Sequence, residues 1–521
     1  MKHMKKLVTL LLTLIMTLAL AVPAAAATVQ NNTSHAYKAY QIFSGTQGEG
    51  ETALGDVAWG TGIDSAKFLA AVRKDTRFVV SNKNIFANCT TAADVAAVMA
   101  NYENNSDVAK AFANVAAQYL TGTGTAIAAN ATSSVTLAAG YYLLVDVTTP
   151  GDGDAMNSAL LQVTNKGDIE ILKKYSVPTV DKSVKDTDDK WGEAADWCIG
   201  SNVPFQLVGT LPENYDDYET YKYVFHDTPC SALQYNGDVK VYVLNDSRRT
   251  ELTTGFTVTP NAAATTGGGT LTITFNDLKK AAGVTSTSKI VVEYTAKLLA
   301  NAEIGLPGNS NKVSLEYASN PNFVVGTGTP PTSKTPEDKV LVFTYELDIN
   351  KVDGANKNKH LANAEFKLEN VAGKWATVDA DGKVTGWVEG KDKGTVLKTD
   401  ASGLAKIIGL DAGTYELYET KAPGGYNKLK EPIKIVITAT LDKEEKTGPA
   451  LTALTIKVGN AAEQDGNLST GTVSTIVENN SGATLPETGG IGTTLFYVIG
   501  GVLMVGAAVL LVTRKRMNNT K

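Results

Sequence analysis

The fold is decided by the stretch Ile290-Val291-Val292-Glu293-Tyr294-Thr295-Ala296-Lys297-Leu298. Apolar residues occupy alternate positions in it, as they do in a strand with one buried face. Similar short segments recur along the chain between Gly, Asn, Asp and Pro, at Val239–Leu244, Thr270–Phe275 and Lys434–Thr438. The pattern predicts a mainly β protein made of tandem Ig-like antiparallel sandwiches.

The N-terminal part departs from this pattern. Ala-rich helical spacing occurs over Ser65–Val72, Ala92–Tyr102 and Ser106–Tyr119, before a strand-like segment at Gly140–Asp146. We therefore expect a first domain in which helices are added to strands.

Domain boundaries are predicted where the composition changes. The first lies near Ser176–Pro178, and the second in Gly326–Pro336, which is rich in Gly, Thr and Pro, as linkers are. The predicted divisions are a signal peptide over 1–27, an α+β domain over 28–175, an Ig-like domain over 176–337, a third domain over 338–480 and a C-terminal sorting region over 481–521.

The first residues have the parts of a secretory signal peptide. Lys2, Lys5 and Lys6 precede an apolar run over Leu7–Val22, and four alanines that end at Ala27 offer a cleavage site. The run is short for a transmembrane helix, which is the alternative. We expect cleavage near Ala27 and export of the chain.

The C-terminus combines an apolar segment with a basic end. Ile491–Val512 is long enough to cross a hydrocarbon core of ~30 Å. Arg514, Lys515 and Arg516 follow it, and the positive-inside rule keeps them cytoplasmic, with the bulk of the chain outside.

Ahead of that segment stands Leu485-Pro486-Glu487-Thr488-Gly489. It resembles the LPxTG signal of sortase substrates. The resemblance implies that the Thr488–Gly489 bond is cut and that Thr488 is transferred to an amine. The membrane segment would then hold the chain only before processing, and the mature protein would be attached to the cell wall.

Composition excludes several classes of function. The formal net charge is −6, and the terminal segments hold basic but no acidic residues, so the mature chain would be more acidic still, against nucleic-acid binding. Four histidines form no cluster with cysteines, and no phosphate loop or hydrolytic set is present. We expect no cofactor, no metal and no turnover enzyme. Of the three cysteines, Cys198 and Cys230 could form a bridge, or all could be unpaired.

The most specific internal motif lies in the third domain: Tyr415-Glu416-Leu417-Tyr418-Glu419-Thr420-Lys421-Ala422-Pro423-Gly424-Gly425-Tyr426. It resembles the YxLxETxAPxGY "E-box" of CnaB-type pilin domains. Leu347–Asp353 resembles their first strand, Val473–Asn479 their last, and Leu361–Phe366 their LxGAxF element, with Asn363 at the usual Gly.

The resemblance implies an isopeptide bond between Lys351 and Asn479, assisted by Glu419. An amine attacks an amide only when neutral, and burial lowers the pKa of a lysine while a buried acid can shuttle protons. Strand alternation places Asn479 on the face of Val473 and Val477, whereas Asn480 would bring Glu478 inside.

The middle domain carries a looser copy of this pattern, similar to the middle domain of Gram-positive backbone pilins. The resemblance implies a Lys182–Asn311 bond with Asp227 as the acid, and Glu293 as the alternative acid. His226 is interpreted as a bystander.

The first domain offers no convincing trio. Lys38, Asp146 and Asn165 fit the pattern only by force, and we expect no crosslink there.

Between the first two domains, Ile169–Tyr175 stands where backbone pilins carry the lysine of their pilin motif. Lys174 is the expected acceptor and Lys173 the alternative, although the usual Tyr-Pro is replaced here by Leu172-Lys173.

The resemblance as a whole is to sortase-assembled major pilins. It implies a subunit joined through Thr488 to Lys174 of the next, in a surface fibre that serves adhesion and colonisation. The implied partners are identical subunits, a sortase and peptidoglycan, with minor pilins and host surface ligands as further partners. The alternative is a monomeric wall-anchored adhesin or minor pilin that binds a host ligand.

Overall fold

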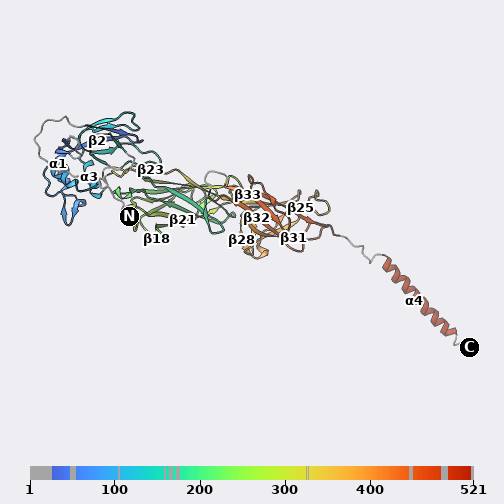
Figure 1. The fold of residues 1–521 in the computed structure, drawn as a ribbon. Coiled ribbons are helices and arrows are strands. Elements are labelled where there is room, and N and C mark those ends of the chain that lie inside the picture. Colours follow the sequence, from blue (N-terminus) through green and yellow to red (C-terminus); the bar gives the residue numbers. More distant parts are fainter. Residues whose placement is uncertain are drawn as a thin grey trace, which may run out of the picture.

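The computed structural model describes residues 26–46, 54–103, 106–157, 160–163, 168–171, 176–323, 326, 328–444, 450–482 and 491–517. Three β-rich domains follow one another along an elongated body in chain order, and a single helix stands apart at the C-terminal end (Figure 1). This confirms the predicted mainly β fold and its tandem organisation.

The first domain combines two small sheets and the two-stranded pair β4–β5 with helices. Helices α1 (Ser65–Val72), α2 (Ala92–Met99) and α3 (Asp107–Ala117) match the predicted segments. The strands are β1 (Ala26–Asn31), β2 (Tyr37–Thr46), β3 (Gly55–Trp59), β4 (Val79–Val80), β5 (Lys83–Asn84), β6 (Thr125–Ile127), β7 (Val135–Ala138), β8 (Gly140–Asp146), β9 (Leu160–Val163) and β10 (Asp168–Ile171).

Side-chain caps and aromatic packing explain these helices. Ser106 caps α3 by accepting from the Ala109 amide, and Thr91 and Asp94 form a reciprocal capping box at α2. Phe68 and Phe112 meet edge to face with their centroids 5.0 Å apart, so the helices share one apolar core with the sheet.

The start of β1 coincides with the predicted signal cleavage. Ala27 is buried in β1 and pairs with Leu137 of β7. Residues 1–25 of the predicted signal peptide lie outside the described residues, and cleavage near Ala27 stays a prediction.

The middle domain is a sandwich of two sheets. Their strand orders are β12-β11-β14-β21-β17-β18, with β16 on β21, and β13-β24-β22-β15-β20-β19, with β23 on β22. The strands are β11 (Val180–Lys185), β12 (Trp191–Gly192), β13 (Ala194–Asp196), β14 (Asn202–Gly209), β15 (Tyr223–Pro229), β16 (Leu233–Tyr235), β17 (Lys240–Asn245), β18 (Arg248–Leu252), β19 (Thr257–Pro260), β20 (Leu271–Phe275), β21 (Lys289–Leu298), β22 (Asn309–Ala318), β23 (Thr332–Lys334) and β24 (Asp338–Phe343).

Strand β24 belongs to the middle sandwich, because it pairs with β22 along Asn309–Val313. The sequence analysis assigns residues from 338 onward to the third domain. In the sheet pairing, the third domain begins with the next strand, at Tyr345.

The third domain packs a three-stranded sheet, in the order β30-β25-β35, against a larger sheet. The larger sheet has the order β28-β27-β26-β31-β32-β33-β34, with β29 on β26. The strands are β25 (Tyr345–Asp353), β26 (Glu365–Asn370), β27 (Lys374–Val378), β28 (Val384–Glu389), β29 (Leu397–Lys398), β30 (Leu404–Leu410), β31 (Gly413–Lys421), β32 (Ile433–Leu441), β33 (Leu451–Val458), β34 (Gln464–Asp465) and β35 (Thr472–Asn479).

Asn363 adopts a left-handed conformation, with φ at 63°. Glycine enters this region without a steric penalty, and Asn tolerates it better than most residues. The conformation explains why Asn can stand at the position where the family motif has Gly.

The middle and third domains share a tight junction. The Ala412 amide of the third domain donates to Asp196 of β13 in the middle domain at 2.8 Å. The Ile199 amide donates to the Gly409 carbonyl at 2.9 Å, and a Cβ on Gly409 would lie 2.5 Å from the Ile199 side chain. Apolar packing is therefore continuous across this junction.

Residues 151–157, which we call the strap, lie between β8 and β9 of the first domain and contact the middle domain. The Met156 amide donates to the Ser319 carbonyl at 2.7 Å, and Ser333 donates to the Gly151 carbonyl at 2.6 Å. The Tyr317 hydroxyl donates to the Asp154 carbonyl at 3.0 Å. The strap thus lies along the edge of the middle sandwich near β22 and β23.

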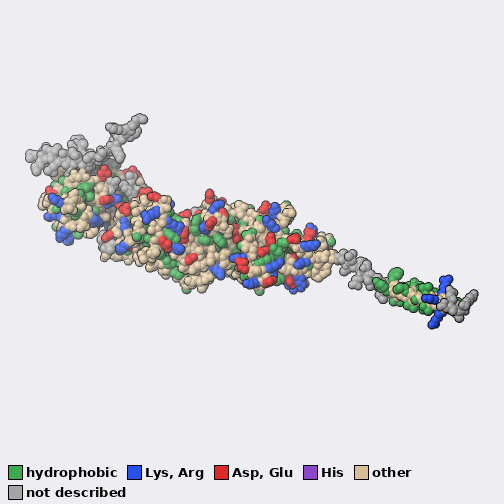
Figure 2. Space-filling view, turned by 90° about the horizontal axis from the view of Figure 1, so that it is seen from below, with side chains coloured by type: hydrophobic (Ala, Val, Ile, Leu, Met, Phe, Trp, Pro, Cys, Tyr) green, Lys and Arg blue, Asp and Glu red, His purple; other side chains and the backbone are tan. Residues whose placement is uncertain are grey.

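Helix α4 (Ile491–Met517) is long and apolar enough to cross a membrane from Leu495 onward. Figure 2 shows hydrophobic side chains along it and basic ones at its end, whereas acidic and basic side chains are mixed over the domains. This is the layout expected of a membrane segment that follows a sorting signal.

Candidate functional site

The third domain brings its three predicted residues together. Lys351 on β25, Glu419 on β31 and Asn479 on β35 are all buried. The Lys351 Nζ lies 3.5 Å from Glu419 Oε1, and Asn479 Nδ2 donates to Glu419 Oε2 at 3.0 Å. The carboxyl group therefore touches both the amine and the amide that the sequence analysis pairs.

Neighbouring groups orient the trio and set its charge. Burial lowers the pKa of Lys351 to about 8, so the neutral amine is accessible near physiological pH. The Lys351 amine also donates to the Val477 carbonyl at 3.1 Å, and the Leu429 amide donates to Glu419 at 2.7 Å. Asn480 is exposed, as strand alternation predicts.

The middle domain assembles an equally enclosed site. Lys182 on β11 belongs to one sheet, while Asp227 on β15 and Asn311 on β22 belong to the other. All three side chains are fully buried, and the Lys182 amine contacts Asp227 Oδ1. Burial lowers the pKa of Lys182 and raises the pKa of Asp227, which favours the neutral amine and the neutral acid.

The alternative acid lies elsewhere. Glu293 lies on the opposite face of β21, where it pairs with Arg249 at 2.6 Å and accepts from Gln206 at 2.7 Å. His226 pairs with Glu316 at 2.8 Å, away from the trio. The geometry therefore favours Asp227 over Glu293 as the partner of Lys182.

Sequence reasoning missed one member of the middle site. The Tyr294 hydroxyl donates to Asp227 Oδ2 at 2.5 Å and accepts from Asn311 Nδ2 at 2.7 Å. It also accepts from the Lys182 amine at 3.2 Å. The signal was available, since the alternation of Ile290–Leu298 places Tyr294 on the buried face.

Both asparagine carbonyls are open to a donor. Asn311 Oδ1 and Asn479 Oδ1 are buried, and no hydrogen-bond partner reaches either one within the described residues. Such atoms are rare in folded proteins. A protonated carboxyl group next to each amide could supply the missing donor as the amide is attacked.

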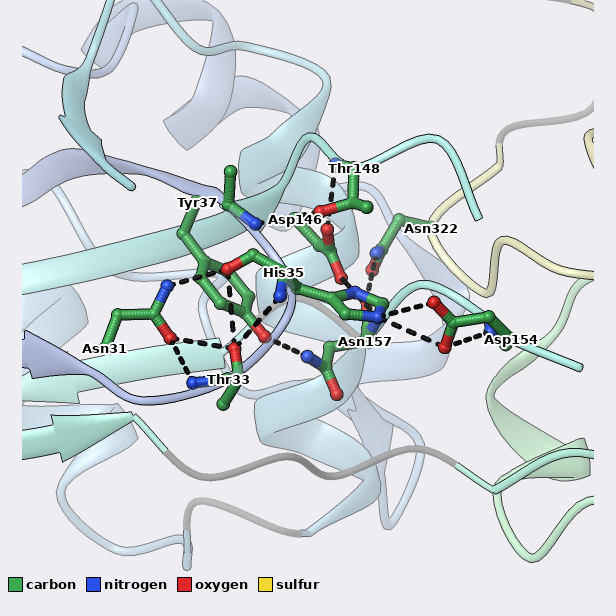
Figure 3. A network of polar contacts seen from close by, with 11 residues as sticks. Asn31, Thr33, His35, Tyr37, Asp146, Thr148, Asp154, Asn157 and Asn322 are labelled. Atoms are coloured by element: carbon green, nitrogen blue, oxygen red, sulfur yellow. Dashed lines mark hydrogen bonds and ion pairs between the residues drawn. The ribbon is translucent and has the colours of Figure 1, made fainter. Parts of the chain in front are cut away.

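The first domain holds a different cluster (Figure 3). His35 is fully buried and joins Asp146 at 2.6 Å and Asp154 of the strap at 3.0 Å. The Asn157 amide donates to Asp146 at 2.8 Å, and its side chain contacts Tyr37. Asp146 thus pairs with a buried histidine, whereas the acids of the other two sites contact a lysine.

The remaining predicted residues divide into two groups. Cys89, Cys198 and Cys230 are unpaired, so the structure contains no Cys198–Cys230 bridge; the Cys198 thiol donates to Asp411 at 2.9 Å instead. Outside the described residues lie Asn165, Lys173, Lys174 and Leu485–Gly489.

Two protein families match parts of the chain. Residues 345–482 match SpaA, the prealbumin-like fold domain, and residues 477–519 match the LPXTG cell wall anchor motif. The first match covers both strands that carry Lys351 and Asn479, and the second covers the sorting signal and the helix that follows it.

Relatives with known names are similar to longer parts of the chain. The trypsin-resistant surface T6 protein of Streptococcus pyogenes serotype M6 is 26% identical in an alignment of 279 residues, and the match covers 43% of this chain and 48% of that protein. Two solved structures are also similar. The group B streptococcus pilus 2b backbone protein is 25% identical, and the match covers 60% of this chain and 99% of that chain with a TM-score of 0.40. The T6 backbone pilin of serotype M6 Streptococcus pyogenes is 15% identical, and the match covers 90% of this chain and 100% of that chain with a TM-score of 0.49.

The family expected from the motifs is thereby confirmed at the domain next to the anchor and at the anchor itself. The third domain is therefore of the SpaA prealbumin-like type and is followed by an LPXTG cell wall anchor, which is the arrangement expected of a pilus subunit attached to the cell wall.

Proposed function

We propose that this chain is the backbone subunit of a covalent pilus, with internal Lys–Asn isopeptide bonds and sortase-made bonds between subunits. The observation that carries the proposal is that two domains ahead of the anchor each bury a lysine, an acid and an asparagine in one connected set of contacts, through Glu419 in the third domain and through Asp227 and Tyr294 in the middle domain. Isolated buried lysines are costly, so a pair of such sites needs a reason.

The internal reaction balances within each site. The neutral Nζ of the lysine attacks Cγ of the asparagine, the Nζ–Cγ bond forms and the Cγ–Nδ2 bond breaks. One proton of the amine ends on the departing nitrogen, which leaves as ammonia. Asp227 or Glu419 carries that proton and is unchanged at the end. No cofactor takes part, and because each bond forms once, the chain is a structural protein and not an enzyme with turnover.

The bond between subunits would join the C-terminal sorting signal of one subunit to the segment between the first and middle domains of the next. A sortase would hold Thr488 as a thioester after removing Gly489, and the amine of Lys174 on the next subunit would displace the enzyme. Lys173 is the alternative nucleophile. Repetition gives head-to-tail symmetry, which does not close and therefore yields a fibre. The elongated arrangement of the three domains in chain order supports this role (Figure 1).

The polymer can be tested in wall extracts on a denaturing gel. The wild-type protein should give a high-molecular-weight ladder, and Lys174→Ala should remove it while Lys173→Ala, the matched neighbour, leaves it in place. A ladder lost only with Lys173→Ala would exchange the two roles. No ladder from the wild type would instead support a monomeric wall-anchored adhesin or minor pilin.

A further inference from the structure

The two crosslinking sites differ in how their acid reaches the asparagine. In the third domain, Glu419 contacts Asn479 Nδ2 directly at 3.0 Å. In the middle domain the acid is an aspartate, which is one methylene shorter. There the Tyr294 hydroxyl contacts both groups, at 2.5 Å from Asp227 and 2.7 Å from Asn311, in addition to the direct interaction of the Asn311 side chain with Asp227.

Packing fixes the Tyr294 ring in this position. Its side chain is buried, and it stacks on Phe205 with the centroids 5.5 Å apart and meets Tyr235 nearly at right angles at 5.9 Å. Burial also raises the pKa of the Tyr294 phenol, so the hydroxyl keeps its proton. A neutral hydroxyl can donate one proton while it accepts another.

The contacts form an unbroken path for a proton. Lys182 Nζ contacts one oxygen of Asp227, the other oxygen accepts from Tyr294, and Tyr294 accepts from Asn311 Nδ2. The path begins at the nitrogen that must lose a proton and ends at the nitrogen that must gain one.

We propose that Tyr294 is a catalytic residue of bond formation in the middle domain, where it relays a proton from Asp227 to the leaving nitrogen of Asn311. The inference rests on the proposed Lys182–Asn311 bond. Once Nζ has added to Cγ, Nδ2 has a free lone pair and takes the hydroxyl proton of Tyr294. The phenol regains a proton from the Asp227 carboxyl group, which regains one from the former amine of Lys182. Ammonia leaves, and both Tyr294 and Asp227 are restored.

The first test uses a protein that spans the first to third domains and carries Tyr294→Phe. Its mass, intact and after digestion into peptides of each domain, is measured over time after purification. The variant loses only the hydroxyl oxygen, so the ring packing remains. Ammonia loss from the middle domain should slow by roughly 100-fold, the usual size of one proton-transfer contribution. Ammonia loss from the third domain should be unchanged and serves as an internal control.

A matched control is Tyr235→Phe. Tyr235 packs on Tyr294, but its hydroxyl accepts from the Val239 amide and lies outside the proton path. The Tyr235→Phe variant should lose ammonia from the middle domain at the wild-type rate. Equal slowing of both variants would mean that packing, and not the Tyr294 hydroxyl, sets the rate.

The decisive variant is the double substitution Asp227→Glu with Tyr294→Phe, which reproduces the direct acid–amide contact of the third domain. Bond formation should recover, whereas a purely structural role of Tyr294 predicts no recovery. Incorporation of 3-fluorotyrosine at position 294 keeps the shape of the ring and makes the phenol more acidic, so the rate should change even if Tyr294→Phe does not fold.

The outcomes separate the two levels of the argument. A wild-type protein without ammonia loss from the middle domain would refute the crosslink itself. If the wild type is crosslinked, but Tyr294→Phe or the fluorinated protein loses ammonia from the middle domain at the wild-type rate, only the role of Tyr294 is overturned.

Discussion

Lys351 on β25 and Asn479 on β35 lie on the same face of two neighbouring parallel strands, two register positions apart, because Lys351 pairs with Val477 and Asp353 with Asn479. Lys182 and Asn311 have a different relationship, since they project from the two facing sheets of the middle sandwich. The proposed bonds would therefore join adjacent strands in one domain and opposite sheets in the other. The sequence pattern suggests that the bond of the middle domain ends on its last strand. The structure differs, because β23 and β24 follow β22, the strand that carries Asn311.

Replacement of Glu419 by Ala should abolish the third-domain bond. Without the carboxyl group nothing links the Lys351 amine to the Asn479 amide, and the proton cannot be carried between them. Compared with the mass calculated from its own sequence, the variant should then have lost one ammonia fewer than the wild type has. Glu416→Ala is the control, because Glu416 lies on the same strand with its side chain exposed. The same ammonia loss in Glu419→Ala as in the wild type would refute the role of Glu419.

Loss of a bond should lower thermal stability. Each proposed bond closes a loop of about 130 residues, for which chain-entropy arguments derived from disulfides give about 5 kcal/mol. Asn479→Ala should therefore lower the melting temperature of the third domain by ten degrees or more, as roughly estimated from domain size, in scanning calorimetry. The transition of the middle domain should stay where it is in the wild type, and equal shifts of both would contradict independent crosslinks.

The sequence could predict which residues face inward, because the alternation of a strand fixes its two faces. Lys351, Asn479 and Lys182 were found in this way with the help of motif order, and all are buried. Alternation does not say which strand is the neighbour. Strand β24 was therefore assigned to the third domain, although its partner β22 lies in the middle sandwich.

Contacts between residues far apart in the chain also could not be predicted from the sequence. Tyr294 was visible as an inward residue, but its contact with Asp227 depends on how two sheets face each other. The pairing of His35 with Asp154 depends on the path of the strap, which no local pattern specifies.

The junction between the middle and third domains should be more stable in mild acid. Burial raises the pKa of Asp196 to about 7, well above its value in an unfolded chain. The folded protein therefore holds an extra proton between about pH 4 and pH 7, and its stability falls as the pH rises through this range, by at most about 4 kcal/mol. The groups that surround Asp196 are Asp186, Tyr345, Asp411 and Lys443.

Calorimetry of the wild type and Asp196→Asn at pH 5 and pH 8 checks this expectation. The amide cannot ionise, so the variant should lose most of the difference between the two pH values. A pH dependence of equal size in both proteins would assign the effect to the neighbouring carboxylates.

The attachment of the first domain should depend on His35. This side chain is fully buried between Asp146 of β8 and Asp154 of the strap, and the strap contacts the middle domain through the Tyr317 hydroxyl. His35→Ala would remove the buried ring nitrogen that pairs with Asp146 at 2.6 Å, at a cost of about 1–3 kcal/mol for a buried polar group that loses its partner. Limited proteolysis should then cut the strap faster, between β8 and β9 of the first domain. His226→Ala is the matched control, since His226 pairs with Glu316 in a partly exposed bridge worth about 1 kcal/mol or less. Equal protease sensitivity of the two variants would show that the strap is held by its backbone contacts to the middle domain and not by His35.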